Sequence, residues 1–380
     1  MRAGSSTVCE MKKEFSQQLE EKQKFHNDHE AFTERAYNTE GLLPDRYVFI
    51  LTNLCNLKCS FCYQKRDPRN DVMTSDDWIN LAGQLPAYAR VLLTGGEPLV
   101  FKEFRRVFSY VAERFSCNMI TNGVLLTEDT IDYLLSSPNF KVLSLSIDDI
   151  GSKNRGFTLK QWEHVVKMMA YFRRKRDELG SACTLDVKSL LLDENAKDIF
   201  ELHKYLVEQI GFDTHVFQLL KGSSIQHSDY MFDFEDILQR ASAPTYDNFD
   251  IIKDQMEMVR QYDLKEGKMS FLHPKIVSLV SEEPLEKMDL LNKKSFIKKN
   301  YSACKFPWSS VHINFDGTLF PCLAVSMGNV KETSLSDIIN GEKISSFRNT
   351  LRKEGTVEAC NRCGWLKFIG ADTGTKVSEN

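Results

Sequence analysis

Short apolar runs alternate with helical patterns about six times between residues 47 and 219. The predicted strands are Tyr47–Leu51, Arg90–Thr94, Asn118–Thr121, Val142–Ile147, Thr184–Leu191 and His215–Leu219. The predicted helices between them are Ser75–Gln84, Lys102–Phe115, Glu128–Leu135, Leu159–Glu178 and Ala196–Gln209. This alternation is typical of a parallel sheet whose strands are joined by crossover helices. The sequence therefore predicts an α/β fold with its active site at the carboxyl ends of the strands.

Candidate site residues follow the predicted strands at the ends where such a site would lie. A cysteine triplet within residues 55–62 follows the first strand. The turn Gly95–Pro98 follows the second strand, Asn122 follows the third, and Ser146 lies at the end of the fourth. Because the carboxyl ends of parallel strands share one edge, we expect these residues to line one rim of the sheet.

Shifts in pattern divide the chain into four predicted segments. These are a helical extension (1–45), the core (46–227), a helical bridge or insertion (228–300) and a small second domain (301–380). In the last segment, Ser310–Phe315 and Thr318–Cys322 read as strands. They flank Asp316–Gly317, a dipeptide typical of a two-residue hairpin turn.

Composition and charge narrow the range of partners. The formal net charge of −4 and the sequence pI of about 6.1 predict no basic surface of the kind that nucleic acids require. No stretch reaches the roughly 20 apolar residues of a membrane span, and the first residues lack the apolar segment of a signal peptide. We therefore expect a cytoplasmic protein with neither a nucleic-acid nor a membrane partner. In such a chain, ten cysteines favour metal binding over disulfides.

The triplet Cys55, Cys59 and Cys62 has the spacing CxxxCxxC. A [4Fe–4S] cube has four irons, so three thiolate ligands leave one iron open to a cofactor or substrate. A zinc site with a fourth ligand elsewhere is the alternative. Zinc sites usually show paired CxxC knuckles, which this triplet does not. The spacing therefore favours an open [4Fe–4S] cluster.

A second group of cysteines lies in the last segment. Cys304 and Cys322 flank the predicted hairpin, and Cys360 and Cys363 form a CxxC knuckle. The hairpin would bring the first two cysteines towards each other, so the two pairs can form one site with four thiolates. Zinc and a [4Fe–4S] cluster both accept this set, and the bare pattern favours zinc.

The run Asn53–Tyr63 resembles the CxxxCxΦC signature of the radical S-adenosylmethionine (SAM) superfamily, with Phe61 in the aromatic position. The turn Gly95–Pro98 resembles the family's GGEP element, whose glutamate, here Glu97, holds the amino group of SAM. The resemblance implies a partial (β/α)6 barrel, SAM as cofactor, and a 5′-deoxyadenosyl radical that abstracts a hydrogen atom from the substrate. It also implies an electron donor such as flavodoxin or ferredoxin, because reducing the cluster requires a low potential.

Family positions also imply the rest of the SAM pocket. Ser146, at the end of the fourth strand, and Arg155, shortly after it, match residues that bind the SAM carboxylate. The complete cofactor-binding set that the resemblance implies is Phe61, Tyr63, Gly95, Gly96, Glu97, Pro98, Asn122, Ser146, Arg155 and Leu192. The structural alternatives are a hydroxyl bound to backbone for Ser146 and a surface salt bridge for Arg155.

The second cysteine group resembles the C-terminal SPASM or twitch region of radical SAM enzymes, with Gly317 ahead of Cys322 and the knuckle Cys360–Cys363 beyond. This resemblance implies a small α+β domain and favours an auxiliary [4Fe–4S] cluster over zinc. The chain has fewer cysteines here than a full SPASM domain. We therefore expect one auxiliary cluster, ligated by Cys304, Cys322, Cys360 and Cys363. Such a cluster would accept an electron when the substrate is oxidised.

Three functions compete for this chain. The preferred hypothesis is oxidation or remodelling of a small polar metabolite such as a sugar or an aminocyclitol. The alternative is maturation of a ribosomally synthesised peptide by thioether or carbon–carbon crosslinking or by epimerisation. A non-catalytic metal-binding scaffold is the third. The preference for a small metabolite depends on the short, charged segment ahead of the core, which lacks the strand pattern of a leader-binding domain.

The residues that would serve the substrate as base or hydrogen donor are not distinguished by their pattern. Side chains available near the predicted rim are His215, Gln218, Lys221, His227 and His312, and the thiols of Cys117 and Cys183 are further candidates. A lone histidine is more often a core or surface residue than a catalyst, and both thiols lie in or beside strand-like runs. The sequence therefore assigns no catalytic residue.

Overall fold

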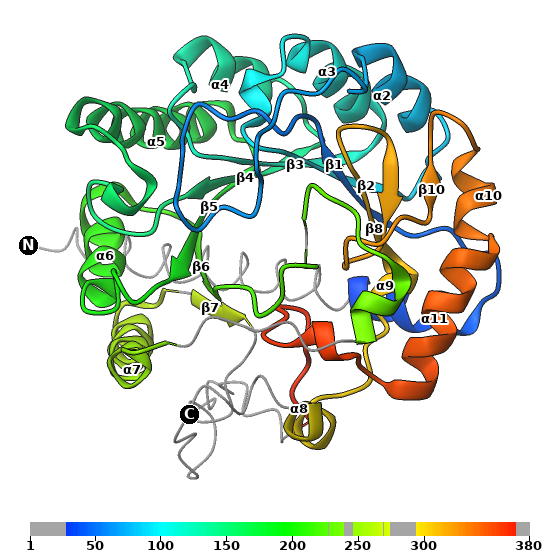
Figure 1. The fold of residues 1–380 in the computed structure, drawn as a ribbon. Coiled ribbons are helices and arrows are strands. Elements are labelled where there is room, and N and C mark those ends of the chain that lie inside the picture. Colours follow the sequence, from blue (N-terminus) through cyan, green and yellow to red (C-terminus); the bar gives the residue numbers. More distant parts are fainter. Residues whose placement is uncertain (1–27, 227, 239–245, 269, 274–293, 370–380) are drawn as a thin grey trace, which may run out of the picture.

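One sheet organises the chain, for which a computed structural model describes residues 28–226, 228–238, 246–268, 270–273 and 294–369 (Figure 1). Its strands are β1 (Arg46–Ile50), β2 (Arg90–Thr94), β3 (Ser116–Thr121), β4 (Phe140–Ser146), β5 (Thr184–Leu191), β6 (Thr214–Leu219), β7 (Ser270–His273), β8 (Ser310–Ile313), β9 (Thr318–Phe320) and β10 (Gly328–Asn329). They lie in the order β10-β9-β8-β1-β2-β3-β4-β5-β6-β7. Strands β1 to β7 are parallel neighbours, so their carboxyl ends meet at one edge.

Helices join the parallel strands and cover the outer side of the curved sheet (Figure 1). They are α2 (Ser75–Ala82), α3 (Phe104–Arg114), α4 (Glu128–Leu135), α5 (Leu159–Leu179), α6 (Ile199–Tyr205) and α7 (Phe249–Glu266). Local capping fixes two of their starts: Thr74 and Asp77 form a capping box at α2, and Thr158 and Gln161 form another at α5. The six predicted strands, the five predicted helices and the α/β class are confirmed.

The segment predicted to be a helical bridge contains a strand. Helix α7 is followed by β7, which pairs in parallel with β6 and adds a seventh strand to the parallel part of the sheet. Helix α8 (Lys294–Asn300) follows later. A strand of four residues is too short to show an alternating pattern, so the sequence could not reveal it. Residues 239–245 and 274–293 of the predicted bridge lie outside the described chain.

The C-terminal hairpin continues the same sheet. Strand β8 pairs in parallel with β1, with Tyr47 opposite Val311, and β9 returns antiparallel beside β8. Phe315 and Phe320 of the hairpin pack against Val48 and Ile50 of β1. Helices α9 (Phe306–Ser309), α10 (Leu335–Ile339) and α11 (Glu342–Glu354) accompany these strands. The hairpin is thus fixed to the strand that leads into the first cysteine motif.

Of the predicted N-terminal extension, the structure describes the part from residue 28, which is helical from residue 28 to residue 38. The Thr33 hydroxyl donates to the Ser309 hydroxyl at 2.8 Å, and Glu34 accepts from Lys305 at 2.6 Å. This helix therefore contacts the segment that precedes β8. No helix in the described chain is long and apolar enough to cross a membrane.

Trp78 of α2 anchors the helix layer to the sheet. Both Trp78 and Phe49 are fully buried, and their ring centroids lie 4.8 Å apart. We predict that Trp78→Ala lowers the free energy of unfolding by about 3–5 kcal/mol, because it leaves a cavity between α2 and β1. Urea denaturation of the metal-free protein measures this change. Asn80→Ala, at an exposed position of the same helix, should change it by less than about 0.5 kcal/mol.

Candidate active site

The first cysteine motif lies in the loop between β1 and α2. The Cys62 N–H donates to the Cys59 carbonyl oxygen at 3.3 Å, which closes a tight turn. The Leu57 N–H donates to the Cys55 sulfur at 3.4 Å. All three thiols are partly exposed, and burial raises the pKa of Cys55 and Cys59. The loop thus presents three accessible sulfurs, one of which already accepts a backbone hydrogen bond.

Gly95 and Gly96 hold the turn after β2 against the start of the cysteine loop. The Gly96 N–H donates to the Thr52 carbonyl oxygen at 2.7 Å. A Cβ atom added to Gly96 would lie 2.3 Å from the Leu54 carbonyl oxygen, and one added to Gly95 would lie 2.5 Å from that of Thr52. Contact between two segments of the chain therefore requires glycine here.

Glu97 is fully buried and ties the ends of two strands together. Its carboxylate accepts the Thr121 hydroxyl at 2.7 Å, the Asn122 N–H at 2.9 Å and the Leu99 N–H at 3.2 Å. Burial raises the pKa of Glu97 to about 7, although these three hydrogen bonds favour the anion. Pro98, the next residue, is buried and begins the short helix η1 (Pro98–Val100).

Asn122 links the end of β3 to the cysteine loop. Its side-chain amide nitrogen donates to the Asn56 side-chain oxygen at 2.8 Å and lies 3.8 Å from the Cys55 sulfur. Its side-chain oxygen accepts the Val124 N–H at 3.0 Å. Asn56, which sequence reasoning did not select, is therefore the direct partner of a predicted site residue. No motif marks it, because the contact depends on the fold.

Arg155 lies beside the same loop and is paired with Asp148, which follows β4. The guanidinium Nε lies 2.8 Å from one Asp148 oxygen, and Nη2 donates to the other at 3.0 Å. The Cys59 thiol lies 3.7 Å from the Arg155 carbonyl oxygen, and the guanidinium carbon lies 5.4 Å from the Phe61 ring centroid. Asp148 is buried and Arg155 nearly so, and thus this pair is not a surface salt bridge. The predicted role of Arg155 in binding the SAM carboxylate stays a prediction.

The remaining predicted SAM residues lie along the same rim. Ser146 is the last residue of β4 and is half-buried. Leu192 follows β5, and its N–H donates to the Asn195 side chain at 2.9 Å, which in turn donates to the Asp148 carbonyl oxygen at 2.7 Å. Tyr63 is 39% exposed. The structure thus places the predicted residues after β1 to β5 at one edge, while their roles stay predictions.

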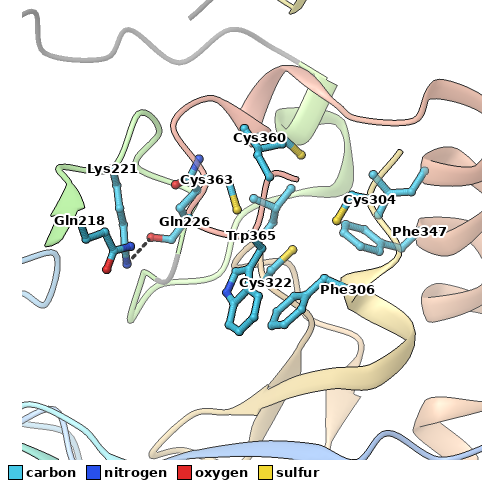
Figure 2. A pocket seen from close by; sticks show the side chains of 14 residues that line it. Gln218, Lys221, Gln226, Cys304, Phe306, Cys322, Phe347, Cys360, Cys363 and Trp365 are labelled. Carbon is cyan, nitrogen blue, oxygen red and sulfur yellow. Dashed lines mark hydrogen bonds between the residues drawn. The ribbon is translucent and has the colours of Figure 1, made fainter. Parts of the chain in front are cut away.

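The second cysteine group lines one small cavity, of about 30 Å³ (Figure 2). Cys304 precedes α9, Cys322 follows β9, and Cys360 and Cys363 form a tight turn in which the Cys363 N–H donates to the Cys360 carbonyl oxygen at 3.2 Å. Among the other lining residues, sequence reasoning did not select Phe306, Phe347, Trp365 or Gln226.

The auxiliary cavity, defined by these four cysteines, has the donor set of a thiolate-bound metal group. Burial raises the pKa of the Cys304 thiol to about 12. Burial and the neighbouring cysteines hold the pKa of Cys322 and Cys360 well above the usual range. Four such thiols become thiolates together when a cationic metal group compensates their charge. Within the described chain, no three Cys, His, Asp or Glu side chains converge on one point as a single metal ion requires.

Two of the substrate-side candidates line the auxiliary cavity, namely Gln218 and Lys221. Burial lowers the pKa of Lys221 to about 7, while Cys363 and Cys62 act in the opposite direction. Lys221 is also half-buried. It lies between the two cysteine groups, because it contacts Tyr63 and lines the auxiliary cavity. These two side chains therefore lie beside the second cysteine group.

The other candidates lie elsewhere. His215 is fully buried near the start of β6, and its ring lies 3.0 Å from that of His203 of α6. It therefore does not lie at the rim, where we had expected it. His312 is buried against Phe320, and burial lowers its pKa to about 3. The buried thiols of Cys117 and Cys183 belong to the apolar core. His227 lies outside the described residues.

Two family models match the chain. The model described as the radical SAM superfamily matches residues 49–206, and the SPASM model, described as an iron–sulfur cluster-binding domain, matches residues 304–364. The chain belongs to the radical SAM superfamily and carries a SPASM domain. The second cysteine group accepts either zinc or a [4Fe–4S] cluster, and the match to the SPASM model favours the iron–sulfur cluster.

Individual relatives agree with this assignment. The sporulation killing factor maturation protein SkfB of Bacillus subtilis is 32% identical over 152 residues, which cover 36% of this chain and 37% of that relative. A tungsten-containing aldehyde ferredoxin oxidoreductase cofactor-modifying protein of Pyrococcus furiosus is 24% identical over 84% of this chain and 87% of its own length. The structure of Streptococcus suis SuiB with SAM aligns with a TM-score of 0.58 and 19% identity, over 80% of this chain and 68% of SuiB. The SuiB likeness supports the fold alone.

A radical SAM domain with a SPASM domain implies three cofactors: SAM, a [4Fe–4S] cluster with three cysteine ligands, and auxiliary [4Fe–4S] ligation. The donor sets present fit these groups. Cys55, Cys59 and Cys62 are the thiols available in the radical SAM loop, and the auxiliary cavity is lined by four thiols, of which that of Cys360 is buried. The assignment of each cysteine as a ligand remains our prediction.

The contact between Gly96 and Leu54 predicts a loss of iron. In Gly96→Ala the new methyl group would collide with the Leu54 carbonyl oxygen and displace the cysteine loop. After anaerobic reconstitution we expect about four fewer irons per chain than in the wild type. Gly83→Ala is the control, because Gly83 has a φ of −64° and its nearest neighbour would lie 3.3 Å away. Full iron content in Gly96→Ala would contradict the structural role given to the glycine pair.

Burial of Glu97 predicts a pH dependence of stability in the metal-free protein. Its folded-state pKa of about 7 exceeds the ordinary value of 4.5, so the folded chain binds this proton more tightly than the unfolded chain. Stability from this group is therefore present at low pH and is lost as the pH rises from about 4.5 to about 7, by about 3 kcal/mol in total. Urea denaturation across this range should show the slope in the wild type. In Glu97→Gln, the free energy of unfolding should not show this decrease between about pH 4.5 and about pH 7.

Proposed function

We propose that this radical SAM enzyme matures a ribosomally synthesised peptide, by forming a thioether or carbon–carbon crosslink in an oxidative reaction. The observation that carries the proposal is the identity of 32% with SkfB, whose name is that of a maturation protein. The match covers little more than a third of either chain, so it supports the reaction class and not a particular peptide. SuiB, which shares the fold at a TM-score of 0.58, has been captured with its precursor peptide SuiA.

These relatives favour the peptide hypothesis over the small-metabolite hypothesis that the sequence suggested. The earlier preference depended on the lack of a strand pattern ahead of residue 46, which does not distinguish the two substrate classes. The relative from Pyrococcus furiosus, named for modification of a cofactor, aligns over 84% of this chain. A small-molecule substrate is therefore the second candidate, and peptidase treatment of the extract distinguishes it from a peptide.

Two groups of residues would take part in the proposed reaction. Cys55, Cys59 and Cys62 would hold the cluster that binds SAM, and Glu97 would contribute an acceptor for the SAM ammonium. When bound, these groups supply a 5′-deoxyadenosyl radical, and the auxiliary cluster supplies an acceptor for one electron. In crosslinking, the peptide loses two hydrogens. One leaves as a hydrogen atom and ends in 5′-deoxyadenosine, and the other leaves as a proton. The remaining electron would pass from the substrate to the auxiliary cluster. An external donor such as flavodoxin or ferredoxin would supply the starting electron.

The test uses reconstituted enzyme, SAM, a reductant and a low-mass extract of the protein's own cells. We expect the extract to stimulate formation of 5′-deoxyadenosine at least tenfold, and peptidase treatment of the extract to abolish the stimulation. Mass spectrometry should then detect a peptide that has lost two hydrogens. In an assay run in D2O, a peptide whose only mass change is one incorporated solvent deuterium would indicate epimerisation instead. Stimulation that survives peptidase would overturn the peptide proposal in favour of a small molecule.

A variant of the auxiliary site separates radical formation from product formation. Cys360→Ser combined with Cys363→Ser should retain 5′-deoxyadenosine formation but lose the oxidised product. Cys183→Ala is the matched control, because Cys183 is a buried core cysteine that directly precedes β5, at the amino end of that strand. Unchanged product formation by the double variant would exclude an electron-accepting role for this site.

A further inference from the structure

The loop that follows β6, residues 220–226, is fastened to the cysteine knuckle of the SPASM domain. The Gln226 side chain donates to the carbonyl oxygens of Ala359 at 2.6 Å and Asn361 at 2.7 Å. In return, the Asn361 side chain donates to the Gly222 carbonyl oxygen at 2.7 Å. A Cβ atom added to Gly222 would lie 2.7 Å from the Asn361 side chain, so the two backbones approach as closely as glycine allows.

Lys221, in the same loop, reaches the first cysteine motif. Its ammonium nitrogen lies 4.0 Å from the ring centroid of Tyr63, the residue after Cys62. The ammonium also donates to the Gln226 carbonyl oxygen at 3.1 Å, an interaction drawn in Figure 2. A cation over an aromatic face at this distance is held electrostatically by the ring. The side chain is therefore fixed at both of its contacts.

The same ammonium borders the auxiliary cavity. Lys221 lines this cavity together with the four cysteines, and Figure 2 shows it on the side of Cys363. Within the described chain, no salt bridge joins Lys221 to a carboxylate, and only one of its three N–H groups has a hydrogen-bond acceptor. Lys221 is thus a cation placed between the two cysteine groups with no acidic side chain to neutralise it.

We propose that Lys221 is a shared counter-charge for the two iron–sulfur sites, which raises the reduction potential of both. Thiolate-ligated clusters become more negative on reduction, and their potentials depend on net charge, hydrogen bonds and exposure. A fixed cation in partly desolvated surroundings stabilises the reduced form of each cluster. Lys221 acts through the clusters and is a positioning residue, not a catalytic one. The inference rests on the two cluster assignments in the proposed function, but not on the peptide substrate.

Redox titration followed by electron paramagnetic resonance tests this inference on the reconstituted enzyme without substrate. In Lys221→Met, which keeps a long side chain without charge, both clusters should titrate at more negative potential. We expect at least a tenfold fall in the ratio of reduced to oxidised cluster at a fixed applied potential, equivalent to about 59 mV for a one-electron couple. In Lys221→Arg, which keeps the charge, both potentials should stay within half of that shift.

Lys305→Met is the matched control. Lys305 follows the predicted ligand Cys304 directly, but its ammonium is paired with Glu34, so its loss should leave both potentials unchanged. A shift of one cluster alone, or of neither, in Lys221→Met would overturn the proposal. If Lys221→Met takes up too little iron, Lys221→Gln gives the same charge test while keeping a donor for Gln226. Iron counts test the cluster assignments separately, so their failure cannot be mistaken for failure of this inference.

Discussion

The contact between the Gly95–Gly96 turn and the cysteine loop is the constraint on which the rest of the site depends. The N–H groups of Gly96 and Glu97 satisfy the carbonyl oxygens of Thr52 and Leu54 at 2.7 and 3.0 Å, where β1 has ended and the loop begins. These bonds continue the pairing of β1 with β2 past the sheet edge, so the loop leaves the barrel in a fixed direction. Glu97 then joins β3 to the same junction.

A second constraint places the SPASM region relative to the radical SAM core. Strand β8 pairs with β1, so the strand that leads to the first cysteine group also carries the hairpin that leads to Cys322. On the other side, Gln226 ties the loop after β6 to the knuckle that contains Cys363. The two cysteine groups are therefore connected through both halves of the sheet, which fixes their positions relative to each other.

The sequence predicted the elements that depend on a local apolar pattern. It did not predict the strand and the residue positions that depend on tertiary contacts. Alternation of strands and helices predicted β1 to β6, because each buried strand carries its own apolar run. It missed β7, whose four residues depend on pairing with β6. It placed His215 near the rim, but strand geometry turns alternate side chains outward, and His215 meets His203 in the helix layer. Lys221 was one of five equal candidates, since its position between two motifs depends on folding.

Exposure around the first cysteine group bears on the substrate class. Leu54 and Tyr63 are 43% and 39% exposed, and all three cysteines of the loop are partly exposed. An enclosed site surrounds a small molecule on all sides, whereas a peptide needs an open rim because its chain must leave the site in two directions. Among the described residues, the exposed side chains of Leu54 and Tyr63 would be available to such a chain. Gln218 and Lys221 do not distinguish a peptide from a sugar substrate, because peptide carbonyls and sugar hydroxyls both accept their hydrogen bonds. The preference for a peptide therefore rests on the likeness to SkfB and not on the polar groups at the rim.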